Sequence, residues 1–352
     1  DDAGGGGGGS ASPRCAGWQV WRPSACGFCM GVPIEDLVDE NDGPPAALGC
    51  AVNMGVDETP ECDIDSEESA QQVGGHIGTF YKLRGGGRVA KLMSPFDFDS
   101  CLGRCGSRQR ASRAEWAFYM QTWCLRKLAA RGHAGASSAL LAPFALGEHP
   151  WAPRSYGACR VTDRGTGAHK NFLVLENVLA GFRRPTQVDL KVGHTTEPEG
   201  GGARDVAKRL FQNFYSNMMT TTGTHCARAV GSKVWDPQAQ AYTSPALNTL
   251  EAAFAGVFGA ASKDVVAELE EGAREIGDWW AKTGTKHIRS YAASLFLVYE
   301  GDAATGAEPR APVLKMIDFA HFHPIGNHPA WPDDCVATGI ASTVAQMQKL
   351  GA

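Results

Sequence analysis

A carboxylate and an ammonium lie two positions apart in the apolar segment TQVDLKVG (186–193), as Asp189 and Lys191. Side chains two positions apart on a β-strand point to the same face of its sheet. A strand here would bury the valines and the leucine that alternate with the charged pair, and would present Asp189 and Lys191 together on its other face. The pair is either a partly buried structural ion pair or part of a site in which both charges take part in chemistry.

Other polar residues also interrupt apolar segments: Lys91 in VAKLM, Ser294 in ASLFLVYEG and Asp318 in MIDFAH. Burying an ionised side chain is costly unless it is paired or solvated within a site. We therefore expect these residues to share one cleft with Asp189 and Lys191.

Hydrophobic periodicity predicts the elements that would position these residues. A β-hairpin is expected over 78–93, because the glycines of RGGG allow the positive φ of a tight turn. Ser112 and Glu115 form a capping-box pattern, which predicts a helix over 112–133. Further strands are expected at 171–179, 186–193, 226–235, 290–300 and 312–320, and further helices at 203–219, 246–281 and 335–350.

Composition limits the class of protein. The 352 residues predict two domains or one two-lobed domain, and a hydrophobic content of 43% predicts a sizeable core. A net charge of −5 argues against a bulk nucleic-acid binder, but a local cluster of Lys and Arg could still bind a small polyanion. No apolar window has the length of a membrane span, and no secretory signal is visible. The 11 scattered cysteines indicate reduced intracellular thiols rather than a disulfide framework.

Residues 1–73 have the composition of a flexible leader. They contain a glycine run, many prolines and the acidic stretch DETPECDIDSEES, with few residues that could form a core. The CxxC pair CGFC (26–29) could belong to a zinc site, but no second pair follows at a matching spacing. Unpaired thiols in the leader are the favoured interpretation.

The segment PTQVDLKVG has the pattern P-x-x-x-D-x-K-x-G and resembles the signature of the inositol polyphosphate kinase family. Other segments resemble that family in the same order along about residues 71–350: QVGGHIG, VAKLM, EWAFY, LENVLAGFRRP, ASLFLVYEG and MIDFAH. The resemblance implies an α+β, two-lobed protein-kinase-like fold (ATP-grasp or SAICAR-synthase-like) with antiparallel sheets in both lobes. An ATP-binding lobe would span 74–178, and a lobe with the substrate and metal site would span 179–352.

The resemblance also implies phosphoryl transfer from ATP to an inositol phosphate, with Mg²⁺ as cofactor. Lys91 would contact the ATP phosphates and Glu115 would orient Lys91, although a plain helix-capping role for Glu115 stays open. Backbone groups of Glu176 and Val178 would hold adenine. Asp189 would lie near the ATP ribose and the reacting centre.

The remaining roles concern the transferred phosphate. Lys191 would lie near the γ-phosphate and the acceptor hydroxyl, and Asp318 would bind Mg²⁺. Ser294 would support the metal or the phosphates, or would only hydrogen-bond the nearby backbone. His321 is expected to pack beside the metal site rather than to bind a ligand.

The segment HTTEPEGGGARD, which follows Gly193, departs from the family pattern because it lacks the early basic residues that would grip substrate phosphates. Arg204 and Lys208 are the first substrate-binding candidates, followed by Arg209, Lys286, His287 and Arg289. The resemblance favours the multikinase or hexakisphosphate kinase branches. A catalytically silent relative that binds inositol phosphates or a protein partner is the alternative, and a kinase-fold enzyme acting on another hydroxyl is a weaker one. The expected localisation is cytoplasmic and/or nuclear, and the sequence leaves the oligomeric state open.

Overall fold

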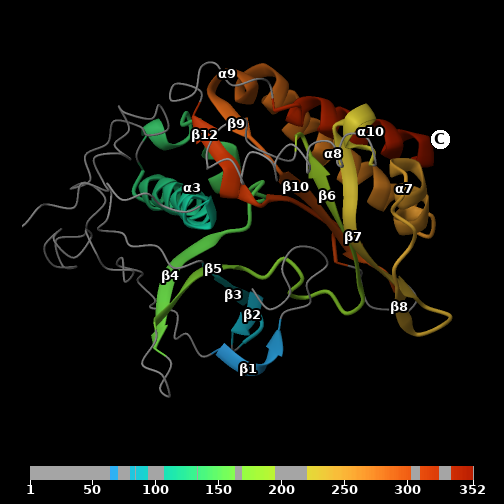
Figure 1. Cartoon of the computed structure of the whole chain (residues 1–352), viewed down its shortest axis with the longest axis horizontal. Helices are drawn as coiled ribbons and strands as arrows, with labels where there is room; N and C mark the ends of the chain where they lie inside the picture. Colours follow the sequence, from blue (N-terminus) through green and yellow to red (C-terminus); the bar gives the residue numbers. More distant parts are fainter. Residues whose placement is uncertain are drawn as a thin grey trace, which may run out of the picture.

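The computed structural model describes residues 64–69, 80–83, 85–93, 107–132, 134–162, 169–194, 220–302, 310–324 and 334–351. Within them the fold is α+β, with two five-stranded sheets whose described strand pairs are all antiparallel (Figure 1). No helix in this described part combines the length and the apolar character that a membrane crossing requires.

The first sheet has the order β1-β2-β3-β5-β4. Its strands are β1 (Ile64–Ser69), β2 (Phe80–Leu83), β3 (Arg88–Leu92), β4 (Ser155–Thr162) and β5 (His169–Glu176). The predicted hairpin is confirmed as β2 and β3, and Gly85 and Gly86 in its turn have φ values of 89° and 70° that only glycine adopts readily. Strand β1 lies within the segment expected to be a leader, and β4 was not predicted. Residues 1–63, including CGFC, lie outside the described residues.

The second sheet has the order β11-β10-β6-β7-β8. Its strands are β6 (Pro185–Val192), β7 (Ala227–Asp236), β8 (Ala241–Thr243), β10 (Ala293–Glu300) and β11 (Val313–Ile317). A separate pair joins β9 (Ile288–Ser290) to β12 (Phe322–Pro324). The strands predicted from 186 to 320 are confirmed, whereas the helix predicted over 203–219 lies outside the described residues.

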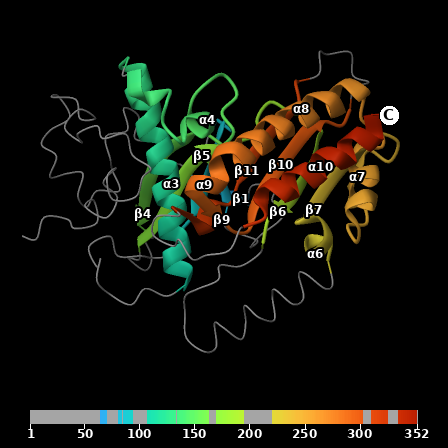
Figure 2. The same ribbon diagram turned by 90° about the horizontal axis from the view of Figure 1, so that it is seen from above.

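Three helices cover one face of the second sheet: α7 (Leu250–Phe258), α8 (Lys263–Trp279) and α10 (Val336–Gly351). Helices α7 and α10 pack against β6 and β7, and α8 packs along α10 (Figure 2). The helix predicted over 246–281 is divided, because Ser262 caps a new helix by accepting a hydrogen bond from the Val265 amide. After α8 the chain continues through two short helical turns, η4 (Trp280–Gly284) and α9 (Thr285–His287). Another short turn, α6 (Thr222–His225), lies earlier in the chain, directly before β7.

Helix α3 (Ser107–Ala130) is the long helix of the first half of the chain and precedes the short turns η3 (Ala134–Ala136) and α4 (Ala142–Ala145). It begins five residues before Ser112, so Glu115 lies inside the helix rather than in its first turn. The capping-box prediction is therefore wrong, and Glu115 is available for another role. The helix packs against β4, β12 and the turn η6 (Phe319–His321).

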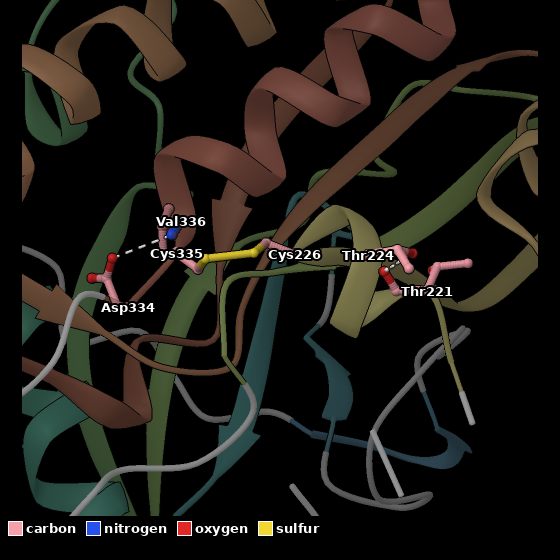
Figure 3. Close-up of a disulfide and its surroundings, with 6 residues drawn as sticks. All are labelled: Thr221, Thr224, Cys226, Asp334, Cys335 and Val336. Carbon is pink, nitrogen blue, oxygen red and sulfur yellow. Dashed lines mark hydrogen bonds between the residues drawn. A yellow bond between two sulfur atoms is a disulfide. The ribbon is translucent and has the colours of Figure 1, made fainter. Parts of the chain in front are cut away.

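A disulfide between Cys226 and Cys335 joins the start of β7 to the start of α10 (Figure 3). This pair differs from the reduced thiols expected from the sequence, while Cys124 remains free. The backbone is crowded at this junction: the Gly193 amide donates to the Cys226 carbonyl at 2.7 Å, and a Cβ on Gly339 would overlap that carbonyl. The end of β6 is thus fixed directly against the start of α10.

Candidate functional site

Strand β6 carries Asp189 and Lys191 in the middle of the second sheet, between β10 and β7. Val188, Leu190 and Val192 are at most 1% exposed and belong to the core shared with the covering helices. Asp189 and Lys191 alternate with them and so share the opposite face, as the period of the strand requires.

Asp318 meets Lys191 at the end of β11. The Lys191 Nζ donates to Asp318 Oδ2, and also to the Ala292 carbonyl oxygen at 2.9 Å. Asp318 has a left-handed backbone with φ of 65°, which a residue with a Cβ rarely adopts. Such strain is found at functional sites, where surrounding packing maintains it.

Lys91 brings the first sheet to the same carboxylate. Its Nζ lies 2.6 Å from Glu115 Oε1 and 3.6 Å from Asp318 Oδ1. The structure therefore places Lys91 from β3, Glu115 from α3, Lys191 from β6 and Asp318 after β11 in one continuous cluster of charges. This arrangement joins the two sheets through paired side chains.

Aromatic packing fixes helix α3 against the turn that contains Asp318. The ring of Phe118, one helical turn after Glu115, stacks on Phe319 with centroids 3.6 Å apart. Phe144 and Tyr119 pack edge-on against the Phe319 ring at 5.9 and 5.7 Å. All four rings are at most 2% exposed. The segments EWAFY and IDFAH thus contact each other, which fixes the helix that carries Glu115 against the turn that carries Asp318.

The two aspartates have opposite electrostatic environments. Burial raises the pKa of Asp318, but the ammonium groups of Lys191 and Lys91 outweigh burial and hold this pKa well below its usual range. Burial raises the pKa of Asp189, and the nearby Asp318 carboxylate raises it further, although Lys191 opposes both. Asp189 is therefore the carboxylate of the pair that takes a proton more readily.

Lys91 stays charged despite its burial. Burial lowers its pKa, but the carboxylates of Glu115 and Asp318 outweigh this effect and raise the pKa above the ordinary lysine value. Lys91 and Asp318 are therefore both ionised at neutral pH.

Ser294 lies directly opposite Lys191 on β10. The Ser294 Oγ and Asp189 Oδ1 are buried and lack a hydrogen bond of good geometry among the described residues, although the Ser294 hydroxyl is near enough to Asp189 to lower the pKa of that carboxyl. The expected alternative for Ser294, a bond to nearby backbone, is therefore not observed there. An unpaired buried polar atom costs about 1–3 kcal/mol, so the weakly paired hydroxyl and carboxylate beside the charge cluster would gain from a ligand that supplies a better partner.

Glu176 and Val178 begin the connection between the two sheets. The Glu176 amide donates to the Arg154 carbonyl at 2.8 Å, and its carboxylate accepts from the Arg154 amide at 3.0 Å. The Asn177 amide donates to Gly87, and the Leu179 amide donates to Asn177 Oδ1. Val178 is the residue of this run whose amide has no partner within the described part of the chain.

Three of the predicted substrate-binding residues, Arg204, Lys208 and Arg209, lie outside the described residues. Arg289 donates to the backbone carbonyl of Thr285 at 2.6 Å, which is a structural contact. His321 belongs to η6, beside Asp318.

Sequence reasoning also missed Gln187, which lies two positions before Asp189 on the same face of β6. Its signal was the same period-two alternation that identified Asp189 and Lys191.

The known proteins to which this chain is similar include inositol phosphate multikinases. "Inositol polyphosphate multikinase beta" of Arabidopsis thaliana is 25% identical in an alignment of 202 positions that covers 47% of this chain and 63% of that protein. The match thus spans less than two thirds of this relative. The inositol phosphate multikinase Ipk2 of S. cerevisiae, solved with ADP and Mn²⁺, is 21% identical, with a TM-score of 0.42 over 56% of this chain and 88% of that one. A second solved inositol phosphate multikinase is 20% identical, with a TM-score of 0.40 over 50% and 85% of the two chains.

The family model for inositol polyphosphate kinases matches residues 172–348. The matched region contains Asp189, Lys191, Ser294 and Asp318, whereas Lys91 and Glu115 lie before it. With half of its length matched in this way, the chain belongs to the inositol polyphosphate kinase family.

Proposed function

We propose that this protein transfers the γ-phosphate of ATP to a hydroxyl of an inositol phosphate, with a divalent cation, Mg²⁺, as cofactor. The observation that carries the proposal is the pairing of Lys91 and Lys191, from two different sheets, with the single carboxylate of Asp318. Membership of the inositol polyphosphate kinase family supports the class of substrate. The two sheets would form a kinase-like pair of lobes, over 74–178 and 179–352, with the charged cluster between them.

The reaction requires positioning and charge stabilisation more than covalent chemistry by the protein. The acceptor oxygen bonds to the γ-phosphorus, the bond to the β–γ bridging oxygen breaks to leave ADP, and the hydroxyl proton is released to water. Lys91, held by Glu115, would bind the nucleotide phosphates. Lys191, at the end of β6, would stabilise charge on the transferred group.

The donor atoms near Asp318 suit a hard divalent cation. No group of three or more His, Cys, Asp or Glu side chains within the described residues could enclose a metal ion. Mg²⁺ commonly binds through one or two carboxylates and completes its shell with phosphates and water. Asp318 fits as the protein ligand, and the buried Ser294 hydroxyl fits as support for the metal or the phosphates. The bound cation would neutralise charge on the phosphates.

The nucleotide would lie along the connection between the sheets. The unpaired amide of Val178 and the backbone of Glu176 would hold the base, and Asp189 would lie near the ribose. This assignment gives the Val178 amide and the Asp189 carboxylate partners on the ligand.

The experiment is phosphate transfer from ATP, with Mg²⁺, to a panel of inositol phosphates that differ in the number and position of their phosphates. We expect transfer to at least one member and a loss of at least about 100-fold in kcat for Lys191→Met. Lys282→Met is the matched control. Lys282 is an exposed lysine on η4, and it pairs with Asp278 at the end of α8.

The result also separates the enzyme from a silent relative. Nucleotide and inositol phosphate binding without transfer to any member of the panel would support a binding module instead. The acidic segment HTTEPEGGGARD after Gly193 is the feature that would explain the absence of phosphate transfer.

A further inference from the structure

Gln187 is a buried glutamine whose amide is unpaired. The residue is 0% exposed, and neither its Nε2 nor its Oε1 has a hydrogen-bond partner among the described residues. A buried carboxamide without partners destabilises a fold, since it gave up hydrogen bonds to water and gained none. Strand interiors favour β-branched or aromatic side chains, so a glutamine here needs a specific reason.

The position of Gln187 on β6 suggests that reason. Gln187, Asp189 and Lys191 alternate on one face of the strand. A strand rises about 3.3 Å per residue, so these side chains follow each other at intervals of about 7 Å. The charged partners of Lys191 lie at one end of this row. The connection that contains Val178 enters β6 at the other end, through Pro185.

This row has the order of the parts of a nucleoside triphosphate. Under the proposed function, phosphates lie at Lys191 and Lys91, and the ribose lies at Asp189. Continuing along the strand in the same direction, the next position is Gln187, and the next part of the ligand is the base. The connection that contains the unpaired amide of Val178 leads into β6 at this end of the row.

The chemistry of the carboxamide matches a purine base with an amino group. A glutamine side chain presents a donor and an acceptor side by side, and it pairs with adenine through the N6 amino group and the N7 ring nitrogen. Guanine presents two acceptors at this edge, O6 and N7, so the carboxamide oxygen would be left without a donor whichever way the side chain is turned. A site built to hydrogen-bond one group discriminates strongly against an analogue that leaves its buried polar atoms unpaired.

We propose that Gln187 contacts the nucleotide base and contributes to the selection of adenine over guanine. This inference rests on the proposed function for the location of the phosphates. It adds a residue from inside the sheet to the base-binding groups of the connecting segment.

The test compares the wild-type protein with Gln187→Met, because methionine has a similar length and volume but no amide. We expect the ratio of kcat/KM for ATP to that for GTP to fall by about 5- to 150-fold, the discrimination of one good bidentate contact. Gln346→Leu is the matched control: it alters another buried glutamine, located on α10, and is expected to leave the ratio unchanged. If the methionine variant does not fold, Gln187→Leu replaces it.

A triphosphate of unsubstituted purine riboside provides a second readout. The wild type should use it less well than ATP, and Gln187→Met should use the two about equally. An unchanged ATP-to-GTP ratio in a folded variant would overturn the inference.

Direct binding separates this inference from the proposed function. If the wild type transfers phosphate from neither nucleotide, calorimetric affinities for ATP and GTP are compared in the wild type and the Gln187→Met variant. A loss of preference in the variant supports the base contact even then, and equal effects on both nucleotides contradict it.

Discussion

Asp189 and Asp318 lie in one site but are expected to affect stability in opposite directions. Replacing Asp318 by Asn should lower the free energy of unfolding, because Lys91 and Lys191 lose a carboxylate that both contact. Replacing Asp189 by Asn should leave the free energy of unfolding equal or raise it. The Asp189 side chain is buried, and the fold has to keep its charge close to that of Asp318.

The distances give the magnitude for Asp318. At an effective dielectric constant of about 20, the 3.6 Å pair with Lys91 corresponds to about 5 kcal/mol of attraction before desolvation. The Asp318 side chain is 34% exposed, so solvent screens part of this energy. The net loss expected for Asp318→Asn is about 1–3 kcal/mol. Phosphate transfer should fall at least about 100-fold in both Asn variants, since each removes a charge at the reacting centre.

The pKa shifts set the pH dependence of these effects. The pKa of Asp318 is lowered in the folded protein, so its stabilising contribution is present above the ordinary aspartate pKa and is lost as the pH falls through the folded value. The pKa of Asp189 is raised, so stability from its protonated form is present below the ordinary pKa and is lost as the pH rises through the folded value. The advantage of Asp189→Asn over the wild type should thus be greater at pH 8 than at pH 4.

Urea unfolding followed by tryptophan fluorescence measures both variants. Asp278→Asn is the control: it removes an exposed carboxylate paired with Lys282 outside the site, and stability should not change. The reasoning fails if both site variants shift the free energy of unfolding in the same direction, or if Asp189→Asn is the more destabilising of the two.

Three other perturbations test separate parts of the structure. Glu115→Gln should raise the KM for ATP about 10-fold or more, because the partner 2.6 Å from Lys91 loses its negative charge; an unchanged KM in steady-state assays would show that Glu115 does not position Lys91. Cys226→Ser should lower the free energy of unfolding by up to about 5 kcal/mol, the value for closing a loop with a sequence separation of 109, whereas Cys124→Ser should not. A free-thiol count that does not rise on reduction would refute the disulfide. Chelation of divalent cations should stop phosphate transfer and leave the circular dichroism spectrum unchanged, and added Mg²⁺ should restore transfer; transfer that persists in chelator would exclude the proposed cation.

The strand that carries the charged pair could be predicted from sequence, because one face of β6 must be apolar while the other carries Asp189 and Lys191. The strands β10 and β11 were predictable for a similar reason, since their apolar runs end in a polar turn. The acidic segment of β1, IDSEES, has no such alternation. It forms an edge strand through backbone pairing with β2, and backbone hydrogen bonds leave little trace in side-chain type.

The tertiary contacts of the site could not be derived from local patterns. Ser112 and Glu115 have the spacing of a capping box, but the helix begins earlier, and only the fold shows that Glu115 faces Lys91. The pairing of Cys226 with Cys335 joins residues far apart in sequence. Both features depend on which elements pack together, and local propensity does not encode this.

Asp318 acts as an internal counter-ion that two lysines share, and this sharing has a consequence for ligand binding. A polyphosphate that reaches Lys91 and Lys191 competes with Asp318 for their ammonium groups. The carboxylate released by that exchange is then free to attract a cation, while a cation at Asp318 weakens its hold on the lysines. Nucleotide and cation should consequently bind with positive cooperativity, each more tightly in the presence of the other.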